Sequence, residues 1–182
     1  MTAALKTLDL QGICITPLRG KDCLFHFTCG EADIDRWAKS KAHKLHEKRR
    51  ARVWCARLNA NSSAIGFFSL SLTTETNAKI DFAHRDAWKN GAPLIFVDFI
   101  GVSRVHQAKG LGKLLLMDAL FKSYQVASLV APYGVALRSL NERTTKFYRS
   151  FGFALAPDER PEKSPLMILP IWSIVQLVEG AS

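Results

Sequence analysis

The stretch from Val97 to Leu120 changes its hydrophobic period halfway along, and this constrains the fold more than any other feature of the sequence. Its first residues are apolar and partly β-branched, which is typical of a buried strand. A polar and basic loop follows from Ser103 to Lys109, and a Gly-Leu-Gly segment occupies 110–112. Beyond it, leucines recur at helical spacing on one face. The stretch predicts a strand, a glycine-containing loop and a helix, in that order.

A strand, a basic loop and a helix in this order predict a binding site for an anion. The first turn of a helix has backbone N–H groups without intrahelical partners and a partial positive charge, and both attract phosphate. Gly110 and Gly112 remove side chains that would keep a pyrophosphate off the backbone, while Lys109 and Lys113 add charge. A glycine pair of this kind is also typical of an ordinary strand-to-helix turn. The segment lacks the spacing of a Walker loop and the third glycine of a Rossmann fingerprint.

Two segments of the sequence carry longer motifs. The first is Gln107-Ala-Lys-Gly-Leu-Gly112, and the second runs Asn141-Glu-Arg-Thr-Thr-Lys-Phe-Tyr-Arg-Ser-Phe-Gly-Phe153. The first resembles the Q/R-x-x-G-x-G/A acetyl-CoA signature of the GNAT N-acetyltransferases. The second resembles the N-x-x-A-x-x-F-Y-x-x-x-G-F block of the same family, with Thr144 where alanine is usual. Two motifs in this order are more specific than either one alone.

Three further segments, FTCGEADIDRW (27–37), IGFFSL (65–70) and LMILPI (166–171), narrow the resemblance. They are similar to segments of one GNAT branch, the toxins of bacterial type II toxin–antitoxin systems that acetylate the amino group of aminoacyl-tRNA. The resemblance covers roughly residues 25 to 171. It implies transfer of acetyl from acetyl-CoA to the α-amino group of aminoacyl-tRNA, which inhibits translation because an acetylated amine is no peptidyl acceptor. The implied partners are aminoacyl-tRNA, a ribbon–helix–helix antitoxin and a second copy of the chain in a homodimer.

The resemblance also implies the site residues. Tyr148 is implied as the general acid that protonates the departing CoA thiolate. The implied cofactor-binding residues are Ile100, Gly101, Val102, Gln107, Ala108, Lys109, Gly110, Leu111, Gly112, Lys113, Asn141 and Phe147. The end of the central strand would pair with the pantetheine amides, and a bulge at Gly101 would free backbone groups there. An oxyanion donor from this backbone would stabilise the tetrahedral intermediate.

Helical geometry turns position 148 about 100° away from 147. We therefore expect Tyr148 to face the cleft while Phe147 is buried, the alternative being that both are simply core aromatics. No general base is assigned: Asp98 is the obvious carboxylate near the central strand, and His84 and His106 are weaker candidates. An α-amine substrate needs little help from a base, because its pKa is only about 7.7 to 8.0.

A helix is predicted from Asp33 to about Arg50, and it is strongly basic. Acids do not alternate with the bases along it, so the face repels itself and favours a phosphate backbone as partner, although a solvated helix face is the alternative. The predicted nucleic-acid-binding residues are Arg36, Lys39, Lys41, Lys44, Lys48, Arg49 and Arg50. His43, His46 and Glu47 have a spacing that could ligate a metal, but the crowd of cations argues against it, and we expect no metal site.

Composition fits one domain, residues 1–182. The chain has 182 residues, 48% of them hydrophobic, and its formal net charge of +9 favours a polyanionic partner. No apolar run approaches a membrane span, and the N-terminus lacks a signal peptide's features. Four cysteines without a C-x-x-C pair predict free thiols in a reducing cytoplasm.

The hydrophobic pattern predicts an α/β fold in the GNAT order, with a central mixed sheet flanked by helices. The expected strands are 13–17, 52–58, 65–73, 97–102, 135–138 and 166–171, and the expected helices are 33–50, 111–124 and 141–150. Asn141 is expected to cap the last of these helices. Residues 79–93 are expected to be irregular or a short helix. Two other functions stay open: a GNAT enzyme acetylating a small-molecule or protein amine, and a non-catalytic nucleic-acid-binding module.

Overall fold

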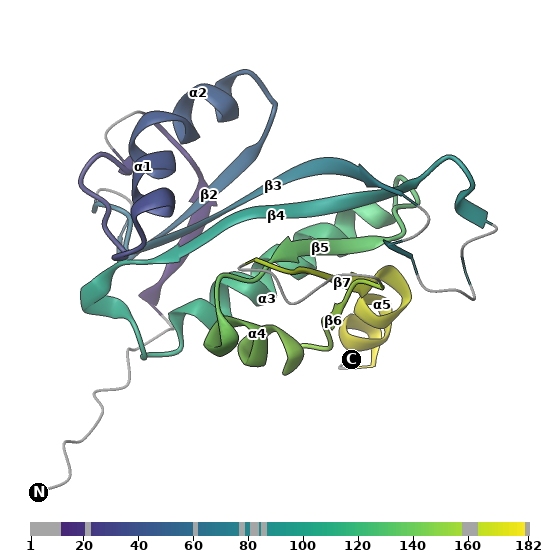
Figure 1. The fold of residues 1–182 in the computed structure, drawn as a ribbon. Helices are drawn as coiled ribbons and strands as arrows, with labels where there is room; N and C mark the ends of the chain where they lie inside the picture. Colours follow the sequence, from purple (N-terminus) through teal and green to yellow (C-terminus); the bar gives the residue numbers. More distant parts are fainter. Residues whose placement is uncertain are drawn as a thin grey trace, which may run out of the picture. The chain divides into compact units, whose positions relative to one another are not determined.

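A seven-stranded mixed sheet organises the chain. The computed structural model describes residues 12–20, 23–59, 62–76, 79–80, 84, 87–157 and 164–180. The strand order is β1-β2-β3-β4-β5-β7-β6 (Figure 1). β4 and β5 are parallel, whereas β1 and β2, β2 and β3, β5 and β7, and β6 and β7 pair antiparallel. The predicted α/β class with a mixed sheet is therefore confirmed.

The strands and helices follow one another along the chain in nearly the predicted order. The strands are β1 (Cys14–Pro17), β2 (Arg52–Arg57), β3 (Gly66–Glu75), β4 (Ala92–Val102), β5 (Gly134–Arg138), β6 (Ala154–Leu155) and β7 (Leu166–Pro170). The helices are α1 (Ala32–Ser40), α2 (Ala42–Glu47), α3 (Leu111–Ala127), α4 (Glu142–Arg149) and α5 (Ile171–Glu179), with a short 3-10 helix, η5, at Arg104–His106.

The single helix predicted over 33–50 is wrong, because the structure breaks it at Lys41 and ends it at Glu47. At the break, the Ser40 hydroxyl donates a hydrogen bond back to the Arg36 carbonyl (2.6 Å), a contact that tends to bend helices. At the far end, the Nδ1 atom of His46 accepts the backbone N–H of Val53 (3.0 Å). This bond holds the end of α2 beside the start of β2, so the chain leaves the helix before residue 50.

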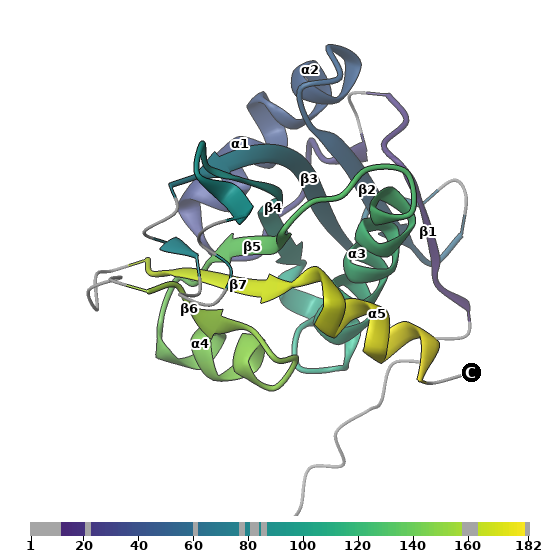
Figure 2. The ribbon, with the colours of Figure 1, turned by 90° about the vertical axis from the view of Figure 1, so that its right-hand side faces the viewer.

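Two other elements extend beyond the expectation. β4 begins at Ala92, because Leu94 pairs with Gly134 of β5 even though Pro93 stands beside it. α5 was not expected: it follows β7 without a loop, as Figure 2 shows in yellow, and its residue Ile174 is fully buried. None of the described helices combines the length and apolar character that crossing a bilayer requires.

The chain divides into two compact units. Unit 1 comprises Met1–Ser71 and Phe99–Ala119, and unit 2 comprises Leu72–Asp98 and Leu120–Ser182. β3, β4 and α3 each contribute residues to both units. The single domain expected for residues 1–182 stays a prediction.

Aromatic rings fill the core of unit 1. The Trp37 ring of α1 stacks on Phe67 (centroids 5.8 Å apart) and on Phe99 (4.6 Å), and Phe27 meets Phe67 edge-on at 5.0 Å. Val53 and Cys55 of β2 belong to the same buried cluster. Burying rings of this size contributes most of the stabilisation of such a cluster. The cluster therefore seats α1 against β2 and β3.

The core of unit 2 is built around β4, β5 and β7. Leu94, Ala136, Leu166 and Ile168 are buried together, with Tyr133 closing one end of the cluster. The register pairs Ala136 with Ile168, so apolar side chains of neighbouring strands share one face.

Gly134 is predicted to be intolerant of any side chain. A Cβ there would lie 2.4 Å from the Leu169 carbonyl oxygen and 3.0 Å from Pro170 Cα, both backbone atoms of the paired strand. Because backbone cannot move aside without breaking the ladder, Gly134→Ala should cost roughly 1–3 kcal/mol in urea unfolding. Gly12→Ala is the matched control, since nothing lies within 4 Å of its Cβ position. Equal unfolding midpoints for both variants would contradict this close approach.

Candidate acetyl-CoA site and catalytic residues

The loop after β4 is held in place by hydrogen bonds to two other segments of unit 1. The Gln107 side-chain amide donates to the carbonyls of Cys29 (2.7 Å) and Val102 (3.0 Å). The backbone N–H of Arg104 donates to the Thr28 carbonyl (3.0 Å), and that of Ser103 to Ile65 (2.9 Å). The Gln107 side chain thus braces the loop, and its predicted contact with the cofactor stays a prediction.

Asp35 fixes the segment to which the loop is attached. Its carboxylate accepts hydrogen bonds from Thr28 Oγ1 (2.9 Å), Cys29 N–H (2.7 Å) and Gly30 N–H (3.3 Å). Burial acts to raise the pKa of Asp35, but the bonds from Cys29, Thr28 and Gly30 outweigh it and lower the pKa. Gly30 has φ +96°, a conformation that favours glycine. The sequence analysis did not identify these hydrogen bonds to Asp35. The pattern that could have indicated them is the Cys-Gly pair followed by an aspartate at position 35.

The backbone between the loop and α3 is shaped to receive an anion. Ala108 and Gly110 both have left-handed φ values, 58° and 86°, a conformation that also occurs in anion-binding nests. The bond from Leu114 N–H to the Gly110 carbonyl (3.1 Å) is the first of the helical ladder, so the amides of residues 111–113 precede it. A Cβ at Gly112 would meet only Val102 Cγ2, at 3.8 Å. Amide donors beside open space fit a diphosphate.

Individual loop residues differ in what they offer a ligand. The Lys109 ammonium donates to the Val105 carbonyl (2.7 Å), so its charge is anchored within the loop. Lys113 is exposed on the first turn of α3, whereas the Leu111 side chain is fully buried and offers only backbone. Residues 108–113 are consecutive in unit 1, and all of them except the Leu111 side chain are at least partly exposed.

The end of β4 contributes Ile100, Gly101 and Val102. A Cβ at Gly101 would lie 3.0–3.2 Å from the side chains of Phe67, Phe27 and Ile34. Close packing of aromatic rings therefore requires glycine there. The bulge predicted at Gly101 stays a prediction.

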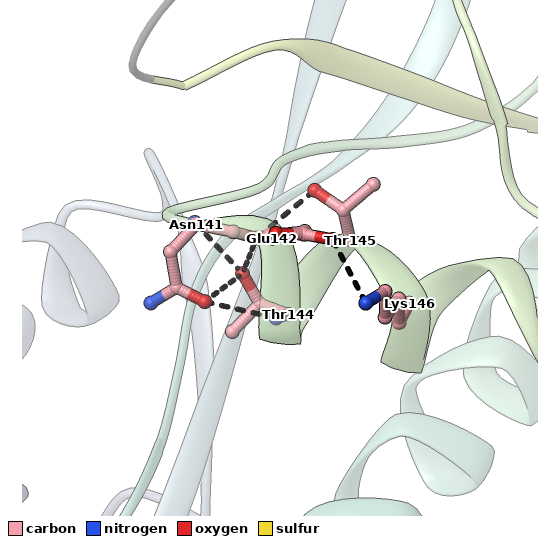
Figure 3. Close-up of polar contacts among 5 residues, drawn as sticks. All are labelled: Asn141, Glu142, Thr144, Thr145 and Lys146. Carbon is pink, nitrogen blue, oxygen red and sulfur yellow. Dashed lines mark hydrogen bonds and ion pairs between the residues drawn. The ribbon is translucent and has the colours of Figure 1, made fainter.

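In unit 2, Asn141 begins α4 with a reciprocal pair of hydrogen bonds (Figure 3). Its Oδ1 atom accepts the Thr144 N–H (3.0 Å), and Thr144 Oγ1 accepts the Asn141 N–H (3.0 Å). Thr144 also meets the Ser139 hydroxyl at 2.8 Å. The threonine that replaces the usual alanine thus closes the helix cap, and the Asn141 amide nitrogen points away from it. The predicted cap at Asn141 is confirmed.

The expected burial of Phe147 is wrong, because its side chain is half-buried, whereas Tyr148 is only 6% exposed. The expectation that Tyr148 faces the cleft stays a prediction. Tyr148 packs near Phe153 (centroids 6.0 Å apart), a contact from beyond the helix. Burial raises the pKa of Tyr148 to about 12. The phenol therefore keeps its proton at neutral pH, as a proton donor must.

The three candidate bases differ in surroundings. His106 Nδ1 lies 2.7 Å from Ser103 Oγ, and burial, with Lys109 nearby, lowers the pKa of His106, which favours its neutral form. His84 stacks on Trp172 (4.4 Å) within unit 2. Asp98 lies partly buried in β4. None of these arrangements singles out a base.

The predicted nucleic-acid-binding residues all lie on the outside of unit 1. Every one is exposed: Arg36, Lys39, Lys41, Lys44, Lys48, Arg49 and Arg50. Lys41 lies at the break before α2 and Lys48 is the cap residue that follows it, so Lys41, Lys44 and Lys48 do not share one continuous helix. Arg36 pairs with Asp33 (3.4 Å), a solvent-exposed contact that neutralises little. We name this set the α1–α2 basic surface.

Fold and loop geometry together define a GNAT-type acetyltransferase. Residues 22–153 match the model of the acetyltransferase (GNAT) family, and the chain belongs to that family. Acetyl-CoA is accordingly its acetyl donor.

Comparison with known proteins gives closer likenesses. A tRNA-acetylating toxin of Mycobacterium tuberculosis is 25% identical over 138 residues, 76% of this chain and 82% of that protein. A structure of AtaT complexed with acetyl-methionyl-tRNAfMet superposes with a TM-score of 0.78 and 20% identity, covering 91% of this chain and 99% of the other. A variant of AtaT bound to the C-terminus of the antitoxin AtaR and acetyl-CoA gives a TM-score of 0.71 at 20% identity, covering 91% and 97%.

Gly112→Ala is predicted to weaken acetyl-CoA binding without unfolding the protein. The added methyl enters open space beside the amides of the first turn of α3, where a diphosphate would approach the backbone. We expect calorimetric acetyl-CoA affinity to fall about tenfold, equivalent to ~1.4 kcal/mol, with an unchanged or slightly raised Tm because alanine favours helix. Gly12→Ala again serves as control. Unaltered affinity would mean that the cofactor does not approach Gly112.

Proposed function

We propose that this chain is a toxin that transfers acetyl from acetyl-CoA to the α-amino group of aminoacyl-tRNA and thereby inhibits translation. The observation that carries the proposal is the presence, within unit 1 of a GNAT acetyltransferase, of both an anion-receiving loop and the α1–α2 basic surface. A small-amine acetyltransferase needs the loop but has no use for the basic surface. The names of the relatives, a tRNA-acetylating toxin and AtaT with its acetylated tRNA, support the same substrate.

Acetyl-CoA supplies a thioester whose carbonyl carbon accepts the amine. In our proposal the amides of residues 111–113 and the loop residues Gln107, Ala108, Lys109 and Gly110 hold its diphosphate. Ile100, Gly101 and Val102 hold the pantetheine part, and Asn141 and Phe147 complete the binding residues. The left-handed φ values at Ala108 and Gly110 and the open space at Gly112 support this assignment.

Tyr148 is the proposed general acid. Its phenol gives a proton to the departing thiolate, and the raised pKa, about 12, keeps that proton in place until it is needed. An α-amine is substantially neutral at physiological pH, since its ordinary pKa is about 7.7 to 8.0. The reaction therefore depends less on a general base to deprotonate the amine than on a general acid to protonate the thiolate.

The proposed partners follow from the substrate and the relatives. Aminoacyl-tRNA lies on the α1–α2 basic surface, a ribbon–helix–helix antitoxin restrains the toxin, and the active form is a homodimer. The AtaT–AtaR complex supports an antitoxin. The substrate places the protein in the cytoplasm.

A transfer assay tests the proposed function directly. The protein is incubated with acetyl-labelled acetyl-CoA and total charged tRNA, and separately with the same tRNA stripped of its amino acids. Label that enters charged tRNA and is released with the amino acid on ester hydrolysis would support the proposal. Intact acetyl-CoA binding without label on tRNA would replace it with a GNAT enzyme for a small-molecule or protein amine.

Tyr148→Phe is predicted to reduce kcat strongly while leaving acetyl-CoA affinity nearly unchanged. Only the hydroxyl is lost, and the ring keeps its contact with Phe153. Loss of a general acid typically costs about 10²- to 10⁴-fold in rate. Stopped-flow turnover and calorimetric acetyl-CoA binding measure the two quantities. Phe153→Leu, which changes the ring packed near Tyr148, is the control for packing. A wild-type kcat for the tyrosine variant would remove Tyr148 from the mechanism.

Reversing charge on the α1–α2 basic surface is predicted to weaken tRNA binding in a salt-dependent way. Lys44→Glu should reduce affinity and lower the slope of log Kd against log salt by about 1, and the triple change at Lys41, Lys44 and Lys48 should lower it further. Lys89→Glu, at an exposed lysine of unit 2, is the matched single control. The same slope for Lys44→Glu and Lys89→Glu would place the tRNA elsewhere.

A further inference from the structure

Unit 1 contains a second polar cluster that acetyl transfer does not use. It consists of Cys23, in the segment before α1, and of Cys55 and Arg57 in β2. Strand residues two apart share a face, so Cys55 and Arg57 both point toward Cys23. The guanidinium Nη2 atom of Arg57 donates to Cys23 Sγ (2.9 Å), and Cys23 packs against the buried cluster that contains Cys55.

The cluster differs in exposure from one member to the next. Cys55 is fully buried in the aromatic core and Arg57 is 7% exposed, whereas Cys23 is partly exposed. Cys23 is thus the member of the cluster that is open to solvent, and it packs against the buried cluster that contains Cys55. The backbone N–H of Ala64 donates to the Cys23 carbonyl (3.3 Å), which fixes the backbone at this cysteine.

Donors on one sulfur favour its thiolate. The hydrogen bond from Cys55 is the largest contribution that lowers the pKa of Cys23, and partial burial opposes it. The hydrogen bond and charge of Arg57 and the Ala64 amide lower the pKa further, to about 6. The pKa of Cys55 is raised, because it is buried and donates to a neighbouring thiolate. One thiol is thus poised to react while the other keeps its proton.

We propose that Cys23 and Cys55 form a peroxide-reactive thiol pair, in which Cys23 is oxidised first and Cys55 closes a disulfide. The Cys23 thiolate attacks one oxygen of hydrogen peroxide, forming an S–O bond as the O–O bond breaks, and the departing hydroxide takes a proton from solvent. The Cys55 sulfur then attacks the Cys23 sulfur, the S–O bond breaks, and the hydroxide leaves as water with the Cys55 proton. Two thiols lose two electrons to one peroxide, which gives two waters.

The pair is independent of the substrate of the acetyltransferase. It lies in unit 1 beside the segment that Asp35 and Gln107 hold, since Cys23 precedes Thr28 and Cys29 by only a few residues. A disulfide there would link this segment covalently to β2. Cys14 is exposed in β1, where it pairs with Arg57 across the ladder, so it is the neighbouring thiol that the experiments must distinguish from Cys23.

The first experiment needs no variant. The reduced full-length protein is treated at pH 6 with limiting iodoacetamide, and labelling of each cysteine peptide is followed by mass spectrometry. A thiol of pKa about 6 is half thiolate there, and after allowance for its lower intrinsic nucleophilicity it should react about tenfold faster than an ordinary thiol. We expect that ratio between Cys23 and glutathione added to the same reaction as the ordinary thiol. Equal rates would overturn the proposal.

The second experiment tests the pair. After one equivalent of hydrogen peroxide, we expect a Cys23–Cys55 linked peptide and a fall in free thiols from four to two, reversed by dithiothreitol. Cys55→Ala should stop at a Cys23 sulfenic acid that dimedone traps, Cys23→Ser should abolish rapid oxidation, and Cys14→Ser should change neither result. A stable Cys23 sulfenic acid in the unaltered protein, a disulfide between other cysteines, or four thiols remaining would each overturn the proposal.

Discussion

The carboxylate of Asp35 is the contact on which the acetyl-CoA loop depends. By accepting three hydrogen bonds from Thr28, Cys29 and Gly30, it fixes a turn whose carbonyls then hold the loop: Thr28 receives the Arg104 amide and Cys29 the Gln107 side chain. Hydrogen bonds to a charged acceptor are stronger than neutral ones. The loop conformation, with left-handed residues at Ala108 and Gly110, is therefore specified by a residue more than seventy positions earlier (108 − 35 = 73).

Unit 1 combines two kinds of anion recognition on one compact scaffold. The loop offers backbone amides in fixed directions, which suits a compact diphosphate, while the α1–α2 basic surface offers exposed side-chain charges, which suit an extended phosphate backbone. The aromatic cluster of Phe27, Trp37 and Phe67 supports both, because α1 and the turn at Gly30 pack on the same rings. Because the chain belongs to the GNAT family, acetyl-CoA is the ligand that we propose for the loop.

The cysteines of unit 1 differ in reactivity because their surroundings differ. Cys29 and Cys55 are buried, and burial raises the pKa of Cys29 to about 11. The hydrogen bond from Cys55, and after it the hydrogen bond and charge of Arg57, lower the pKa of Cys23. The acetyltransferase fold thus carries a chemical feature that its catalytic chemistry does not require.

The sequence by itself determined what depends on neighbours a few residues apart. The strand–loop–helix at 97–120, the cap at Asn141 and the α/β order follow from hydrophobic period, glycine position and capping chemistry. The tertiary structure alone decided what depends on distant partners. Val53 holds His46 and helps end α2 early, Phe153 packs near Tyr148, which is more buried than Phe147, and Arg57 meets Cys23 across 34 positions. A local sequence pattern cannot predict such contacts, because they depend on how segments that are distant in the sequence pack together.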